Sequence, residues 1–349
     1  MKGVACFPAK ERQIFFDFIR GVAIIMVVAI HTFGLCYTSE TLSLLGLLFR
    51  QVMNCAVPIF CTCSAYFLAK KDTSGKRYKN FLIRQVARVY VPYLFCSLPY
   101  LFFDVWSNGW TWTALVKYVS CSYSVFYFVA LIIQFYILLP LFKSNRFLKN
   151  AILGFAISFV WITCYVYIVQ VRFTVPLILY AGVICCFWVY FPLGISCGAT
   201  EGCKDRRTLL YICLSIFFLA LSIVESLFLL SASGTLSGVG IKPTALMFST
   251  SICLYIFGTD VRNKLANSTF TRVIAWLGRY SFGVYLTHML LLALLTKGLS
   301  YISFVKNIGG GGEMVFNYFD GIAIECTLPV NRQKALPQIV SLVAGSLVV

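Results

Sequence analysis

The feature of the sequence that most constrains the fold is a succession of long apolar runs separated by short polar segments. A helix crosses the hydrocarbon core of a bilayer when it contains about 18 or more mostly apolar residues. Nine runs of about this length lie near residues 14–37, 47–69, 81–104, 123–142, 149–170, 175–198, 208–230, 243–259 and 273–296. They predict an all-α fold, a polytopic bundle of transmembrane helices.

Composition supports the same class of protein. Of the 349 residues, 60% are apolar and only 12% are charged, which departs in both respects from an ordinary soluble domain. No segment between the runs is long enough to form a soluble domain of useful size. We expect an integral, multi-pass membrane protein. The stretch after the opening "MKGVACFPAKERQ" is too long for a signal peptide, so it is expected to be a retained first span.

The positive charge carries information about topology. Lys and Arg give a formal net charge of +17, but they occupy short loops and form no single patch, which argues against a nucleic-acid partner. Segments with few positive charges alternate with basic ones, which are "KGVACFPAKER", "KKDTSGKRYK", "KSNRFLK", "KDRR" and "DVRNKLANSTFTR". Because Lys and Arg accumulate on the cytoplasmic side, we expect a cytoplasmic amino terminus. The tryptophans of "WSNGWTW" suit the opposite interface.

The fifteen cysteines do not indicate a metal centre. Most lie singly within apolar runs, where a thiol behaves as a small hydrophobic group. The close pairs, Cys61 with Cys63 and Cys185 with Cys186, lack metal-ligand spacing and nearby histidines. No metal site is expected.

The pattern changes after the last apolar run. We divide the chain into a transmembrane domain, residues 1–298, and an atypical tail, residues 299–349, which contains "GGGG" and three acidic residues. Its final apolar stretch is too short to span a bilayer. Three alternatives stay open for this tail: disorder, packing on the surface, or a change of reading frame in the gene.

Polar groups interrupt the first apolar run. In "DFIRGVAIIMVVAIHTF", Asp17 and Arg20 are close enough to pair on a helix, and His31 returns to within roughly 20° of the Arg20 face. His31 then stands roughly 16 Å from Arg20 along the axis. Ionisable groups at membrane depth are costly, which favours a functional stripe. The alternatives are that Arg20 reaches the headgroups and that His31 only bonds a neighbouring helix.

The chain contains only two histidines, His31 and His288, and both lie in apolar runs. His288 follows Tyr285 by one helical turn and Ser281 by two, which makes a second polar stripe. A membrane-buried imidazole suits proton abstraction or relay. A structural role for His288 stays open beside the catalytic one.

Arginines also open the third run. Arg84 and Arg88 are i,i+4 neighbours, and other basic residues precede them. Arginine binds phosphate well, so with Arg20 they could form a cytoplasm-facing site for a nucleotide-like carrier. Binding of lipid headgroups explains the same residues equally well.

Four stretches in order resemble the acyltransferase 3 family of membrane acyltransferases. The first run resembles its first-helix signature, with Arg20 and His31 separated by ten residues. "VPIFCTCSAYFLAKK" resembles its second helix, although Ala65 stands where glycine is common. "FYFVALIIQFYILLPLF" is similar to its helix with Tyr and Pro, here Tyr136 and Pro140, and "SFGVYLTHMLL" resembles its late Ser, Tyr, Leu and His segment.

The resemblance covers roughly residues 12–296, and the chain departs from the family in two places. Arginines separated by two residues often begin the family's third helix, whereas Arg84 and Arg88 are separated by three. The family core has about ten helices, and here the tail replaces the closing one, so a bundle of about nine to ten helices is expected. The hydrolase-like extracytoplasmic domain of some members is not seen in this sequence.

The resemblance implies acyl transfer, an acetyl group by expectation, from cytoplasmic acyl-CoA to a hydroxyl of a surface polysaccharide or lipid-linked sugar. It implies location in a bacterial inner membrane, contact with membrane lipids and no permanently bound cofactor. His31 is placed to deprotonate the acceptor, with Asp17 positioning Arg20. Arg20, Arg84 and Arg88 are the expected ligands of the CoA phosphates. No oxyanion stabiliser can be identified from the sequence.

Two other functions stay open. One is a membrane transporter or exporter of a glycan or small molecule, in which the buried His and Arg residues form a path. The other is an inactive, truncated relative of the acyltransferases. The acceptor, the acyl length and the oligomeric state are not specified by the sequence.

Overall fold

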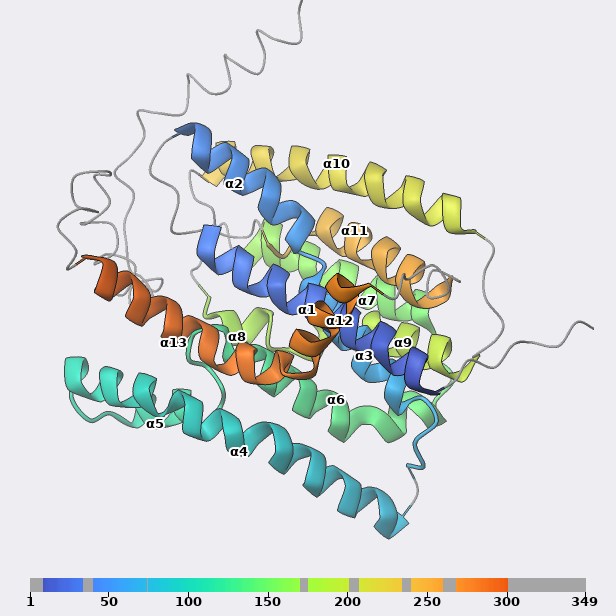
Figure 1. The fold of residues 1–349 in the computed structure, drawn as a ribbon, viewed down its shortest axis with the longest axis horizontal. Helices are drawn as coiled ribbons and strands as arrows, with labels where there is room; N and C mark the ends of the chain where they lie inside the picture. The colour runs from blue at the N-terminus through green and yellow to red at the C-terminus, as the bar shows by residue number, and fades with distance from the viewer. Residues whose placement is uncertain are drawn as a thin grey trace, which may run out of the picture.

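The computed structural model describes residues 9–33, 40–73, 75–169, 175–200, 207–233, 240–259 and 268–300. Every regular element in this part of the chain is a helix, and the helices form a bundle (Figure 1). Six of them are long and apolar enough to cross a membrane: Ile14–Thr32, Gly46–Leu68, Gly75–Asn108, Tyr127–Ser144, Ala151–Val169 and Thr208–Leu229. Shorter apolar helices lie at Pro243–Gly258 and Ser281–Leu295. The all-helical, multi-span prediction is confirmed, whereas the helix number and the cytoplasmic amino terminus stay predictions.

The elements follow one another along the chain with few long interruptions. They are α1 (Ala9–Phe33), α2 (Glu40–Met53), α3 (Ala56–Leu68), α4 (Gly75–Asn108), α5 (Trp112–Val119), η2 (Ser124–Phe126), α6 (Tyr127–Ser144), α7 (Ala151–Cys164), η3 (Tyr165–Val169), α8 (Leu177–Tyr180), η4 (Ile184–Phe187), α9 (Tyr190–Ala199), α10 (Thr208–Ser233), α11 (Pro243–Cys253), η5 (Leu254–Gly258), α12 (Thr269–Arg279) and α13 (Ser281–Ser300).

The run expected as one span at residues 175–198 is broken into α8, η4 and α9. The break is buried in the protein, and the side chain of Gln134 on α6 explains how it is tolerated. Its Nε2 donates to the Gly182 carbonyl at 2.6 Å, and its Oε1 accepts from the Ile184 amide at 3.1 Å. Backbone groups that leave the helical pattern are thereby bonded, as a water-poor environment requires.

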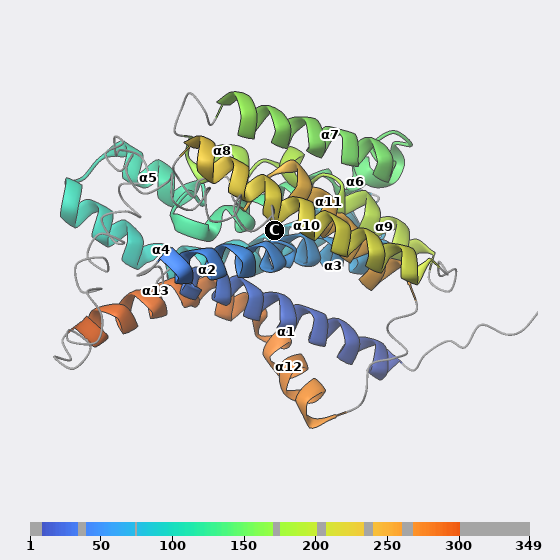
Figure 2. The ribbon, with the colours of Figure 1, turned by 90° about the horizontal axis from the view of Figure 1, so that it is seen from above.

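The run expected as one span at residues 273–296 is also divided. It forms α12 and α13, which meet at Tyr280, and α12 points away from the α13 axis (Figure 2). The Ser268 hydroxyl caps α12 by accepting from the Thr271 amide at 3.1 Å. The break turns α12 so that it packs along α1 and not in line with α13.

Small residues bring the central helices into backbone contact. On α9, a Cβ at Gly194 would overlap the Thr62 carbonyl oxygen, and one at Gly198 would overlap that of Tyr66. α3 and α9 therefore pack as closely as membrane helices with small residues at their interface do. The core around them is aromatic, and Phe135 stacks on Phe191 with ring centroids 4.2 Å apart.

Two ends of the bundle can be told apart. The Lys143 ammonium at the end of α6 donates to the Lys71 carbonyl after α3, so two of the basic loops lie at one end. At the other end of α4, Asp104 accepts from Tyr123 at 3.0 Å and forms an ion pair with Lys117 at 3.2 Å. The tryptophans of this end, Trp106, Trp110 and Trp112, are exposed, as expected of an interfacial belt.

Candidate functional site

One buried carboxylate holds two arginines. Asp17 is 1% exposed, and its Oδ1 lies 2.5 Å from the Arg20 Nη2. Its Oδ2 accepts from the Arg279 Nε at 3.3 Å, which ties α1 to α12. The predicted pair of Asp17 and Arg20 therefore forms, and Arg279 is an addition that the sequence reasoning missed.

The position of Arg279 depends on two glycines where α1 crosses α12. A Cβ at Gly278 would overlap the Asp17 carbonyl oxygen, and one at Gly21 would overlap the Ile274 carbonyl oxygen. The two backbones are therefore in direct contact beside the carboxylate. The side chains of Arg20 and Arg279 keep 33% and 57% of their surface exposed, so both guanidinium groups have donors left for an anion.

The histidines of the chain meet at the other end of α1. His31 on α1 and His288 on α13 have ring centroids 5.3 Å apart. They are 257 positions apart in the sequence, so only the packing of α13 against α1 brings them together. The sequence named both residues as candidates but did not predict that they form one pair.

Hydrogen bonding fixes the orientation of the second histidine. His288 is 4% exposed, and its Nδ1 lies 2.6 Å from the Tyr285 carbonyl oxygen. A carbonyl only accepts, so Nδ1 carries the proton and Nε2 of the neutral ring has a free lone pair. The Nε2 atom is buried without a hydrogen-bond partner. This nitrogen is thus available as a base or as an acceptor.

Tyr285 is a positioning residue for this ring. Its hydroxyl donates to the Val125 carbonyl at 2.5 Å, and its ring packs edge-on against Phe126 and Phe128. Because His288 bonds the backbone of Tyr285, anchoring Tyr285 to η2 also anchors the imidazole. Ser281 lies buried at the first position of α13.

Two residues that the sequence reasoning did not select lie close to the pair. Arg50 on α2 interacts electrostatically with His31 and with Tyr127 at the start of α6. Arg50 interrupts the apolar run 47–69. The cost of a charge at membrane depth, the same signal that selected His31, could have selected Arg50 as well.

The structure does not bring the other predicted phosphate ligands to Arg20. Arg84 and Arg88 lie exposed on α4. Among the contacts of the described residues none joins either arginine to Arg20, and α4 lies apart from α1 in Figure 1. Arg88 instead interacts electrostatically with Tyr136. The Tyr136 carbonyl accepts a hydrogen bond from the Tyr78 hydroxyl, which links α6 to α4.

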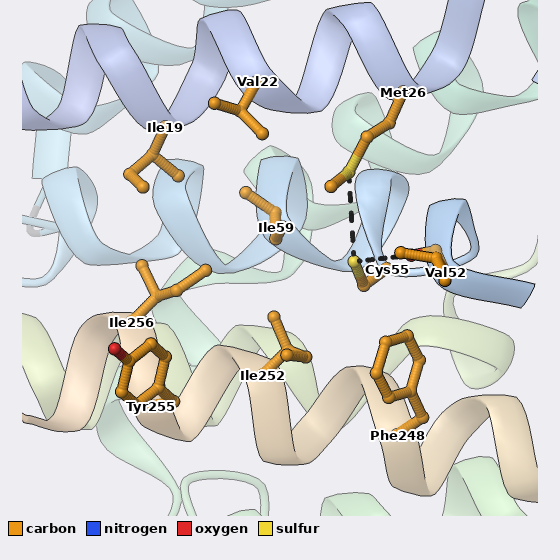
Figure 3. Close-up of a pocket in the computed structure, with 10 residues that line it drawn as sticks. All are labelled: Ile19, Val22, Met26, Val52, Cys55, Ile59, Phe248, Ile252, Tyr255 and Ile256. Carbon is orange, nitrogen blue, oxygen red and sulfur yellow. Dashed lines mark hydrogen bonds between the residues drawn. The ribbon is translucent and has the colours of Figure 1, made fainter. Parts of the chain in front are cut away.

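An apolar cavity of about 230 Å³ lies against α1, on the side away from Asp17 and His31 (Figure 3). It is lined by Ile19, Val22, Met26, Val52, Cys55, Ile59, Phe248, Ile252, Tyr255 and Ile256. At about 100° per residue, the α1 positions of this lining face away from Asp17 and His31. Within the described ranges, no three His, Cys, Asp or Glu side chains are grouped so as to hold a metal ion. The tail, residues 301–349, lies outside the described residues.

Helix α1 therefore takes part in two polar groups, a carboxylate clamp with two arginines and a pair of histidines. The family model described as an acyltransferase domain, that of the acyltransferase 3 family, matches residues 13–349. The chain belongs to the acyltransferase 3 family. Membership establishes a membrane acyltransferase in general terms, and the matched range of the acyltransferase 3 model includes the tail. No curated protein and no solved structure matches the chain significantly.

Proposed function

We propose that the protein transfers an acyl group, an acetyl group by preference, from cytoplasmic acyl-CoA to a hydroxyl of a surface polysaccharide or lipid-linked sugar. The observation that carries the proposal is that α1 takes part in both groups. Its His31 pairs with His288 of α13, and its Asp17 holds Arg20 and Arg279. One helix thereby joins a base to an anion-binding group. The proposed location is the bacterial inner membrane, with the clamp toward the cytoplasm.

The clamp is the proposed binding site for the phosphates of the donor. Arginine forks bind phosphate by paired hydrogen bonds, and Asp17 holds Arg20 and Arg279 in fixed positions. Arg20 and His31 stand roughly 16 Å apart along α1, a distance that the pantetheine arm of CoA has to span to reach the histidines. Arg84 and Arg88 lie on α4, a different helix from that of Arg20. They are therefore proposed to contact acyl-CoA only where it enters the protein.

The proposed chemistry is a direct attack on the thioester. His31 accepts the proton of the acceptor hydroxyl as its oxygen forms a bond to the acyl carbonyl carbon. The carbonyl oxygen becomes an oxyanion. When the carbonyl reforms, the carbon–sulfur bond breaks and the CoA thiolate takes the proton from His31. The products are the acyl ester and CoA thiol, and no cofactor beyond acyl-CoA takes part.

His288 is proposed to support His31. Tyr285 holds its ring in place, its Nε2 has no hydrogen-bond partner, and its ring centroid lies 5.3 Å from that of His31. An acceptor at this position orients the neighbouring imidazole and stabilises the imidazolium that forms, as a carboxylate does in other catalytic groups.

The test is an acyl-transfer assay with the protein in lipid nanodiscs, radiolabelled acetyl-CoA and a panel of glycan acceptors. His31→Ala is expected to abolish transfer while the protein stays folded in the membrane. Undiminished transfer by this variant would contradict the proposal. Movement of a glycan in proteoliposomes without consumption of acetyl-CoA would favour the transporter instead.

The acceptor is identified in cells. Surface glycans of a deletion strain are expected to lose ester-linked acyl groups, and the gene restores them. The His31→Ala gene is the matched control and is expected not to restore them. Retention of all ester-linked groups in the deletion strain would exclude a surface glycan as the acceptor.

A further inference from the structure

The register of α1 and α2 places a third ionisable side chain beside the histidines. The two helices run antiparallel and side by side (Figure 1). The Cys55 thiol lies 4.0 Å from the Met26 sulfur, a contact drawn in Figure 3. Arg50 precedes Cys55 by five residues, and His31 follows Met26 by five residues. His31 therefore lies roughly 7 Å beyond Met26 along α1, and Arg50 lies in the last turn of α2, just before the turn that carries Cys55. Because the helices are antiparallel, both residues lie on the same side of this contact.

Electrostatic interactions are consistent with this placement of the Arg50 guanidinium. Arg50 interacts with His31 on α1 and with Tyr127 on α6. The guanidinium therefore lies near His31, on the side of α2.

The Arg50 guanidinium is not neutralised by a partner. Its Nε is buried without a hydrogen bond, and no carboxylate in the described part of the chain forms an ion pair with it. The Gly240 backbone lies next to it, and a Cβ there would be 3.5 Å from the Arg50 Nη2. A buried donor without a partner costs free energy, which is tolerated where a ligand or an intermediate completes it.

A buried network holds the adjacent part of α2 in place. Lys242 has no exposed surface, and its Nζ donates to the Gln51 Oε1 at 2.5 Å and to the Ser226 hydroxyl. The Gln51 oxygen also accepts from Ser222 at 3.0 Å. Gln51 is the neighbour of Arg50, so this network fixes the turn of α2 from which the guanidinium projects.

The network does not remove the positive charge. Glu225 is the carboxylate that interacts with Lys242, and it is bonded by Tyr167 at 2.5 Å and by the Thr244 amide at 3.1 Å. Among the described residues no ion pair joins Glu225 to Arg50, so this network does not compensate the Arg50 charge.

We propose that Arg50 stabilises the oxyanion formed when the acceptor attacks the thioester carbonyl. The inference rests on the proposed function and adds the component that this chemistry lacks. As the acceptor oxygen bonds to the carbonyl carbon, the carbonyl oxygen takes the electron pair and its charge lies next to the guanidinium. When the carbon–sulfur bond breaks, the pair returns and Arg50 is again unpaired. A fixed donor aimed at charge that develops only in the transition state raises kcat without strengthening substrate binding.

The experiment compares Arg50→Met, which keeps an unbranched apolar stem but removes the guanidinium, with Arg50→Lys, which keeps the charge. Arg272→Met is the matched control, because Arg272 is an exposed arginine on α12. Each variant is purified into nanodiscs, checked for folding by its thermal transition, and assayed with acetyl-CoA and with neutral and anionic acceptor sugars. Loss of an oxyanion donor lowers kcat by about 100-fold to 1,000-fold.

The expected result is that Arg50→Met lowers kcat by this factor with neutral and anionic acceptors alike, while both KM values stay within about threefold of wild type. Arg50→Lys retains more activity than Arg50→Met but less than wild type, because an ammonium lacks the guanidinium fork. If Arg50→Met does not fold, the Lys variant decides: a lower kcat at unchanged KM supports the proposal, and wild-type kcat overturns it.

Two results overturn the inference and leave the proposed function in place. One is wild-type kcat in Arg50→Met while His31→Ala is inactive. The other is a defect confined to anionic acceptors or to the acceptor KM, which would make Arg50 an acceptor-binding residue. Absence of acyl transfer by the wild-type protein with every acceptor overturns the proposed function and this inference together.

Discussion

At the scale of single residues, the chain separates binding from proton transfer along one helix. Asp17 and Arg20 lie near the start of α1, and His31 lies near its end. Partners for both groups come from distant parts of the sequence, Arg279 for the clamp and His288 for the histidine. Each role therefore depends on a pair of side chains and not on one residue.

Asp17→Asn is expected to weaken donor binding. Asparagine keeps the size of the side chain but removes the charge that holds both arginines. A hydrogen bond to a charged group contributes about 1.5–3 kcal/mol, so KM for acyl-CoA is expected to rise by about tenfold or more. Steady-state kinetics measure this rise. Arg279→Ala is expected to raise the same KM and Arg272→Ala to leave it unchanged; equal effects of the two α12 variants would contradict the clamp.

The two histidines are expected to act as one unit. His31→Ala and His288→Ala each lower kcat, and the double variant is expected to be no slower than His31→Ala alone, because groups that act together are strongly non-additive. A double-mutant cycle on kcat measures the coupling. Losses that simply multiply would mean that His288 has a separate, structural role.

At the scale of secondary-structure elements, breaks in the helices build the site. The division at Tyr280 frees α12 to lie along α1 and bring Arg279 to Asp17, while α13 brings His288 to His31. A straight span over residues 273–296 could not supply both residues to α1 in this way. The expectation of one uninterrupted helix was therefore wrong at the place that matters most for the site.

Gly278→Ala is expected to damage the contact between α1 and α12. The added Cβ would overlap the Asp17 carbonyl oxygen, which is backbone and cannot turn aside. Overpacking of this kind costs about 1–3 kcal/mol or more, so the thermal transition should fall and donor KM should rise.

Gly283→Ala is the matched control, because nothing lies within 4 Å of a Cβ built at this glycine of α13. Its thermal transition should stay the same or rise, since alanine favours a helix over glycine by about 1 kcal/mol. A normal transition and normal kinetics in Gly278→Ala would show that the backbone contact is unimportant.

At the scale of the whole molecule, the basic loops and the packing agree on which segments share an end. The Lys143 side chain bonds the Lys71 backbone, and the sequence placed the loops of both on the cytoplasmic side. Phe16 near the start of α1 packs against Tyr66 and Phe67 near the end of α3, which brings the amino-terminal part to the same end. The orientation of this end in the membrane stays a prediction.

Protease accessibility tests that orientation. A cleavable tag inserted at Asn145 is expected to be protected in right-side-out vesicles, and one at Asn108 is expected to be cut, because positively charged loops stay in the cytoplasm. Both insertions lie at helix ends, where they interrupt no span. Cleavage of the Asn145 tag together with protection of the Asn108 tag would reverse the orientation and place the Asp17 clamp outside the cytoplasm.

The sequence alone determined the class of fold, the family and the first ion pair. Hydrophobic length predicts spanning helices because lipid excludes polar segments, and helical spacing predicts the pair of Asp17 and Arg20 because it is local. Three contacts depend on how the helices cross: His31 with His288, Asp17 with Arg279, and Arg50 with His31. Those crossings are set by glycine contacts and helix breaks between segments far apart in the chain, which only the tertiary structure decided.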